Sequence, residues 1–135
     1  MPTPNIQLIL QAQLTGTNNL LSPAPQIIQI DMANPTLGAT VANYDPYFQA
    51  AIAGSSVPFP GGITTVWVAY VRNLSSTANV NVGITTPASG TVSTSVLLPG
   101  GVFLIFNPAE SAGGVNSLLL TGVGGVVPCE VLVAA

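Results

Sequence analysis

Alternation of apolar and polar side chains constrains this chain more than any other feature of its sequence. From Gly62 onward, apolar residues recur at every second position in short runs, separated by turn-forming residues at about ten-residue spacing. The expected strands are Ile63–Asn73, Asn79–Thr85, Thr91–Leu98, Val102–Phe106, Val115–Thr121 and Val126–Ala134. No segment of about ten residues or more carries the apolar stripe of an amphipathic helix. The pattern predicts an all-β fold with antiparallel neighbours, either a sandwich or a barrel.

Two further runs with the same alternation lie near the N-terminus. They are Asn5–Thr15 and Gln26–Met32, which bring the expected number of strands to about eight in a single domain over residues 1–135. The hydroxyl-rich run Thr91–Leu98 is expected to point its Ser and Thr side chains to solvent. Its inward residues would then be Val92, Val96 and Leu98.

Residues 33–61 break the alternation, because proline and glycine punctuate them repeatedly. The stretch DPYFQAAIA could form one or two helical turns, with Asp45 as the N-cap and Pro46 at the first helical position. A long irregular connection inside a compact domain is uncommon and often functional. We therefore expect this loop to make contacts with a ligand or a partner.

Charged residues are almost missing from the chain. They make up 4% of its 135 residues, against a usual share of about a quarter, and they are Asp31, Asp45, Arg72, Glu110 and Glu130. A mixed-charge surface normally keeps a monomer soluble and protects the edges of its sheets. Either uncharged polar residues do this here, or other subunits cover much of the surface, and the second alternative predicts assembly. A net charge of −3 without a basic cluster argues against nucleic-acid binding.

The residue types that are missing exclude most enzyme mechanisms. The chain has no histidine and no lysine, so serine and cysteine triads, a Schiff base and a phosphate-binding P-loop are all impossible. The four carboxylates are expected to be solvated surface acids rather than a catalytic pair, and we expect no metal and no cofactor. Cys129 stands alone, which excludes an intrachain disulfide, and it is expected to be a buried apolar residue.

Membrane insertion and export are not expected either. The mean hydropathy is positive, and the chain has no charge from Asn73 to Ala109, but proline and glycine interrupt that stretch well before the roughly 20 apolar residues of a spanning helix. The N-terminal residues MPTPNIQLIL lack the cationic region and cleavage site of a signal peptide.

Aromatic residues concentrate in the irregular loop. Tyr44, Tyr47, Phe48 and Phe59 could form an exposed patch that stacks on a sugar or binds a host receptor, assisted by Asp45. The alternative, which we favour, is that the loop folds back and its aromatic side chains close the core or pack against a neighbouring subunit.

The stretch YVRNLSSTANVNVG contains the only cation of the chain, Arg72. It is expected to form a hairpin in which Val71 ends one strand, NLSSTA turns, and Val80 and Val82 face the core. Arg72 would then make a surface ion pair or an interface contact. Trp67, in the strand interior VWVAYV, is expected to pack in the core.

The order of motifs in the C-terminal half resembles small virion proteins of tailed bacteriophages. The motifs are YVRNLSSTANVNVG, a hydroxyl-rich strand, LLPGGVFLIF and VNSLLLTGVGGVVPCEVLV, and they cover roughly Thr64 to Val133. The resemblance implies a jelly-roll-like β-sandwich without catalytic residues, attached to a capsid or tail as a decoration, cement or fibre component.

The same resemblance implies where such a protein works and with what. The expected partners are further copies of the chain, with a trimer favoured, and a major capsid or tail protein. The protein would be assembled into the virion in the host cytoplasm and released by lysis. Residues 1–20 could form a strand or arm that pairs with the open sheet edge of a neighbour. The competing hypothesis is a binding module that recognises a glycan or host receptor through residues 44–59.

Overall fold

The structure is a computed structural model that describes residues 7–12, 26–31, 42–86, 89–106 and 114–135. Throughout these residues the ordered elements are strands, and no helix is present. The chain divides into two compact units, Met1–Thr40 and Val41–Ala135, each of which is considered by itself.

The first unit contains one antiparallel ribbon. Its strands are β1 (Gln7–Ala12) and β2 (Gln26–Asp31), within the limits expected from the sequence. The register pairs Leu8 with Ile30 and Leu10 with Ile28, so these four apolar positions share one face of the ribbon.

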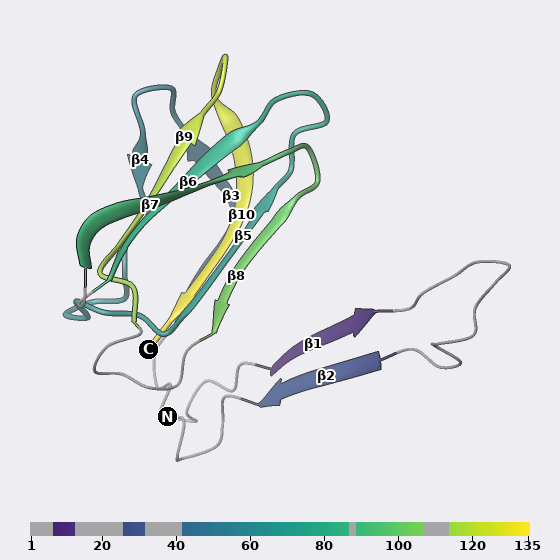
Figure 1. Cartoon of the computed structure of the whole chain (residues 1–135), viewed down its shortest axis with the longest axis vertical. Coiled ribbons are helices and arrows are strands. Elements are labelled where there is room, and N and C mark those ends of the chain that lie inside the picture. Colours follow the sequence, from purple (N-terminus) through teal and green to yellow (C-terminus); the bar gives the residue numbers. More distant parts are fainter. Residues whose placement is uncertain (1–6, 13–25, 32–41, 87–88, 107–113) are drawn as a thin grey trace, which may run out of the picture. The chain divides into compact units, whose positions relative to one another are not determined.

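The second unit is a sandwich of eight strands in two antiparallel sheets (Figure 1). One sheet has the order β3–β10–β5–β8 and the other β4–β9–β6–β7. The strands are β3 (Ala42–Ala50), β4 (Ser55–Ser56), β5 (Val68–Asn73), β6 (Val80–Thr86), β7 (Ser89–Leu97), β8 (Val102–Phe106), β9 (Ser117–Gly122) and β10 (Val127–Ala134). The expected antiparallel β-sandwich is therefore confirmed, and the barrel alternative is not.

The strand pairing is that of a jelly roll. The pairs β3·β10, β4·β9, β5·β8 and β6·β7 are nested one inside the next, as in a single long hairpin folded over itself. Pairing of β10 with β5 and of β6 with β9 then joins these ribbons into two four-stranded sheets. This double-sheet arrangement gives a jelly roll its eight strands.

The core lies between the two sheets. Alternate residues of the central strands are buried there, including Val71, Val131 and Val133 from one sheet and Val82, Leu118 and Leu120 from the other. Burial of branched aliphatic side chains at about 25 cal/mol per Å² is the main favourable term for such a fold. Burial of Val71, Val80 and Val82 and of Cys129 is as expected, and Trp67 packs against the core just before β5.

Two strands replace part of the loop expected at residues 33–61, and the predicted helical turn is wrong. Residues 42–50 form β3, and the Asp45 carboxylate accepts a hydrogen bond from the Tyr47 amide at 2.9 Å instead of capping a helix. Pro46 and Tyr47 lie where the register with β10 shifts, so that two residues of β3 oppose Glu130 alone. An edge strand tolerates proline at such a bulge, which is why proline misled the sequence interpretation. Residues 33–41 of the expected loop lie outside the described residues.

The hairpin expected at YVRNLSSTANVNVG is also wrong. β5 pairs with β10 and β8, whereas β6 pairs with β9 and β7, so the segment between β5 and β6 crosses from one sheet to the other. Asn73 and Ser75 hold this crossing through side-chain bonds to Ala78: the Asn73 amide donates to the Ala78 carbonyl, and Ser75 Oγ accepts from the Ala78 N–H. Short polar residues therefore signalled a turn correctly, but not which sheet the next strand joins.

Candidate functional site

The structure divides the predicted site residues between the surface and the core. Tyr44 and Tyr47 are exposed on β3, at 56% and 73% of their full areas, and Asp45 is exposed between them. Phe48 and Phe59 instead pack against the core. The four aromatic residues therefore form no single patch, and for Phe48 and Phe59 the favoured alternative of core closure is correct.

A row of apolar and aromatic residues crosses the outer face of the β3–β10–β5–β8 sheet. The registers place Tyr44 opposite Leu132, Leu132 opposite Tyr70, and Tyr70 opposite Leu104. These residues alternate with the buried Val71, Val131 and Val133, so they point away from the core. We call Tyr44, Leu132, Tyr70 and Leu104 the tyrosine row.

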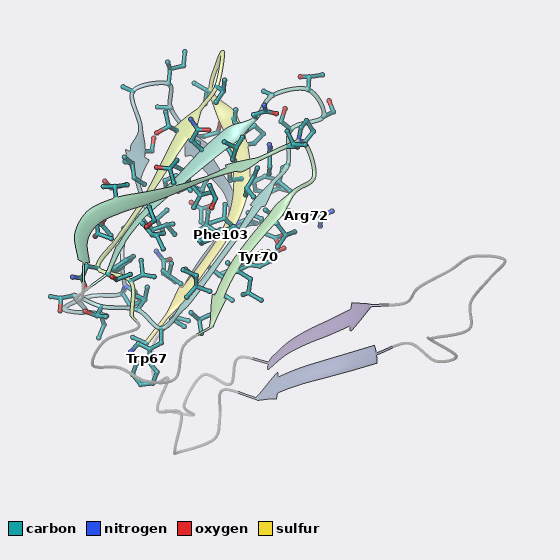
Figure 2. All side chains as sticks on the ribbon, in the orientation of Figure 1. Trp67, Tyr70, Arg72 and Phe103 are labelled. Carbon is teal, nitrogen blue, oxygen red and sulfur yellow. The ribbon has the colours of Figure 1, made fainter. Side chains whose placement is uncertain are left out.

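Beside the tyrosine row lie the charged residues of this face. Glu130 and Arg72 are cross-strand partners in the register of β10 with β5. The Tyr44 hydroxyl donates a hydrogen bond to Glu130 Oε2 at 3.3 Å. Arg72 is exposed and extends away from the sheet (Figure 2).

Desolvation, and then the neighbouring Glu130, raise the pKa of both tyrosines. Partial burial, and then the hydrogen bond to Glu130 and its charge, raise the pKa of Tyr70 to about 12, and Arg72 opposes the shift. The pKa of Tyr44 is also raised, by desolvation and by the Glu130 carboxylate. Both phenols are therefore neutral hydrogen-bond donors at physiological pH. The face offers two phenols, one carboxylate and one guanidinium, which are groups suited to recognition.

The outer face of the other sheet carries no charge on its described strands. None of the residues in β4, β6, β7 or β9 is Asp, Glu, Lys or Arg. Thr85 and Ser117 join across β6 and β9 through their hydroxyls at 2.7 Å. On the same outer face, Val92, Val96 and Leu119 are exposed at 55%, 58% and 38%. We call these three residues the valine patch.

The valine patch was missed because the sequence interpretation assigned β7 to the wrong face. Val92, Val96 and Leu98 were expected to point inward, but all three are exposed, and Leu97 is the buried residue. Leu97 is paired with the buried Val80. The residues of β7 that face the core are therefore shifted by one position from those expected. A shift of one residue exchanges the two faces of a strand. Gly83 could have indicated this orientation, because a glycine in a strand often marks a close approach, and here it leaves room for the Val92 side chain on the outer face.

Metal and membrane sites can be assessed in the part of the chain that the structure describes. There, no three His, Cys, Asp or Glu side chains gather as a metal site would require. Across the same residues, no helix has the length and apolar character needed to span a membrane.

Comparison with known proteins gives no relative: no protein-family model, no curated protein and no solved structure matches this chain. The resemblance to bacteriophage virion proteins therefore stays a prediction.

Proposed function

We propose that this chain is a non-enzymatic structural protein that works by assembling with further copies of itself. The observation that supports this most directly is apolar surface on both outer faces. In the tyrosine row Tyr44 is exposed and the other three residues are half-buried, and the valine patch is exposed on the other sheet. Exposed apolar groups on a nearly uncharged surface are typical of surfaces that other subunits cover.

The place that we propose for this assembly is a bacteriophage-like virion, where the protein decorates or cements the capsid or tail. The motif order between Thr64 and Val133 supports this, and jelly rolls are among the folds that build viral capsid domains. Jelly rolls also serve as lectins and cupins, so the fold alone does not choose the function. The proposed partners are a major capsid or tail protein and copies of the chain, with residues 1–20 as a candidate contact arm.

Light scattering coupled to size-exclusion chromatography on the purified full-length chain tests the proposal. We expect an assembly of several chain masses at micromolar concentration, and three chain masses would support the trimer favoured from the sequence. A monomer throughout the concentration range, with no affinity for purified phage-like particles, would rule the proposal out. Cryo-electron microscopy of the native particle would then locate the protein on the head or the tail.

A second candidate is a module that binds a glycan or host receptor. The observation that favours it is the exposed Tyr44 ring beside the Glu130 carboxylate, since sugars stack on aromatic faces and donate hydrogen bonds to carboxylates. Tyr44→Ala should then abolish binding on a glycan array, while Tyr47→Ala, on the same strand, should reduce it less, because it is the Tyr44 hydroxyl that is hydrogen-bonded to Glu130. No glycan bound by the wild-type chain would exclude a glycan ligand.

A further inference from the structure

The two sides of the sandwich differ in how their edge strands are protected. On one side the edges are β3 and β4. β3 carries the charge of Asp45, together with Pro46 and a register shift, and β4 is only two residues long. Charge, proline, bulges and short length are the usual means of preventing edge-to-edge pairing.

The opposite side has neither charge nor proline in its strands, although β7 has a register shift in its pairing with β6. Its edges are β7 and β8, whose sequences SGTVSTSVL and VFLIF contain no charge and no proline. β8 is unusual for an edge, because it is apolar at every position. Such continuous apolar runs are typical of strands covered on both faces and paired on both sides. Among the described strands, however, β8 has a neighbour on one side only, which is β5.

The hydrogen-bonding direction of β8 follows from its pairing with β5. The Asn73 amide donates to the Gly101 carbonyl at 2.9 Å, in line with the register that sets Arg72 opposite Val102. Hydrogen-bonded and non-hydrogen-bonded pairs alternate along an antiparallel ladder, so Phe103 is bonded to Val71 and Ile105 to Ala69. The N–H and C=O groups of Val102 and Leu104 therefore point away from β5, towards the open edge.

We propose that β8 is the edge through which two copies of this chain join their β3–β10–β5–β8 sheets, by antiparallel pairing about a two-fold axis at Leu104. This inference rests on the proposed function, which requires contacts between copies, and it predicts a dimer as the basic unit in place of the trimer favoured from the sequence. Leu104 would face Leu104 of the second copy, Val102 would face Phe106, and Phe103 would face Ile105. Every cross-strand pair is then apolar on both sides, and the tyrosine row continues from one copy into the other.

A second copy of the chain fits this edge, because each position of VFLIF then meets an apolar position of its partner. The edge is neutral and apolar, so it meets its own copy without repulsion between like charges. Among the described residues, the charge next to this edge is that of Arg72, opposite the Val102 end of β8. The two-fold axis places the two Val102 ends at opposite ends of the paired strands, which keeps the two arginines apart.

Position 104 provides a sharp test, because it is its own partner across the axis. Leu104→Lys and Leu104→Glu should each weaken association of the full-length chain, since like charges face each other. Mixing the two variants should restore the dimer, with the mixed species roughly fivefold tighter than either homodimer, as measured by native mass spectrometry. Equal amounts of mixed and unmixed species, in statistical proportion, would overturn the proposed register.

A backbone variant tests the edge itself. Leu104→Pro removes an N–H that makes no bond to β5, and edge strands accept proline at such positions, so the sandwich should retain its cooperative unfolding transition while dimers dissociate. Leu104→Ala keeps the N–H and is the matched control, with association preserved. If Leu104→Pro does not fold, the mixing experiment with Leu104→Lys and Leu104→Glu tests the proposed edge by itself. Wild-type and Leu104→Pro chains that assemble equally would refute the edge and leave the proposed function standing, whereas a monomeric wild type without affinity for phage-like particles would refute both.

Discussion

At the scale of single residues, Asn73 shows how a jelly roll tolerates a buried polar group. It is the one polar residue in the described part of the chain that is fully buried. Its side-chain nitrogen donates to the carbonyls of Ala78 at 2.8 Å and Leu97 at 3.2 Å, and its oxygen accepts from the Ser75 amide at 2.9 Å. The side chain thereby connects the end of β5 with the crossing to β6 and with the end of β7. A fully bonded amide of this kind specifies where the chain changes sheets.

Replacing Asn73 by alanine should therefore be costly. Asn73→Ala leaves two carbonyls and one amide without partners, for a loss of about 2–3 kcal/mol in the free energy of unfolding. Urea denaturation measures this loss. Asn43→Ala is the control, because it removes one exposed bond to the Pro58 carbonyl and should cost less than about 0.5 kcal/mol. Equal effects of the two changes would contradict a structural role for Asn73.

The raised pKa of Tyr70 predicts a loss of stability in alkali. Its pKa is about 12 in the folded chain against 10.0 for an ordinary tyrosine, so the folded state favours the neutral phenol. The resulting stabilisation is fully present below pH 10 and is lost as the pH rises towards 12. We expect the difference in unfolding free energy between wild type and Tyr70→Phe to be constant below pH 10 and to shrink above it. If the unfolding free energies of the two proteins instead ran parallel up to pH 12, the stabilisation assigned to the neutral Tyr70 phenol would be refuted.

A change at Glu130 provides the control for that experiment. Glu130→Gln removes the negative charge that raises the pKa of Tyr70 and of Tyr44. The tyrosinate absorbance of the variant should therefore rise at a lower pH than in the wild type. An unchanged titration would show that burial alone sets both values.

At the scale of elements, the end of β9 approaches its neighbours more closely than any side chain would allow. A Cβ at Gly122 would lie 2.1 Å from the Gly125 carbonyl oxygen and 2.6 Å from that of Ala50. The Gly122 amide also donates to the Ala51 carbonyl at 3.0 Å. Close backbone packing at this point holds together the end of β9, the turn before β10 and the end of β3. The GVGG motif therefore allows the backbones of neighbouring strands to pack closely at this point.

Gly122→Ala should accordingly destabilise the sandwich by about 2–3 kcal/mol, because backbone atoms must move to admit the methyl group. Gly125→Ala is a matched control in the same turn, since a Cβ there meets nothing within 4 Å. Its effect should lie within about 0.5 kcal/mol. Thermal unfolding compares the two variants, and a tolerated Gly122→Ala would mean that the β9–β10 turn is looser than described.

At the scale of the whole molecule, the shortage of charge should determine how assembly responds to salt. If apolar edges and faces hold the copies together, association should change by less than about twofold between roughly 0.05 and 0.5 M sodium chloride. Leu104→Lys is the contrasting variant, since salt screens its self-repulsion and should strengthen its association. Sedimentation velocity would measure both. Strong weakening of the wild-type assembly by salt would instead point to ion pairs through Arg72.

The sequence predicted the alternation, the all-β class, the antiparallel pairing and most of the strand limits, because these follow from local periodicity. VFLIF was assigned to the same residues that form β8, and Val80 and Val82 are buried as the pattern indicated. The sequence also determined the exclusions, since a chain without histidine or lysine lacks whole classes of chemistry. The scarcity of charge is likewise a property of the sequence, and it led to the proposal of assembly.

Only the tertiary structure decided which strands share a sheet and which faces point outward. β3 was not recognised because an edge strand with a bulge at Pro46 has little periodic signal of its own. β7 faces the opposite way from its apparent pattern, because pairing with β6 sets its register and an edge strand contributes few buried residues to resist this. The tyrosine row joins residues far apart in sequence, from Tyr44 to Leu132. Such sites are created by the pairing of distant strands, and local sequence patterns do not encode that pairing.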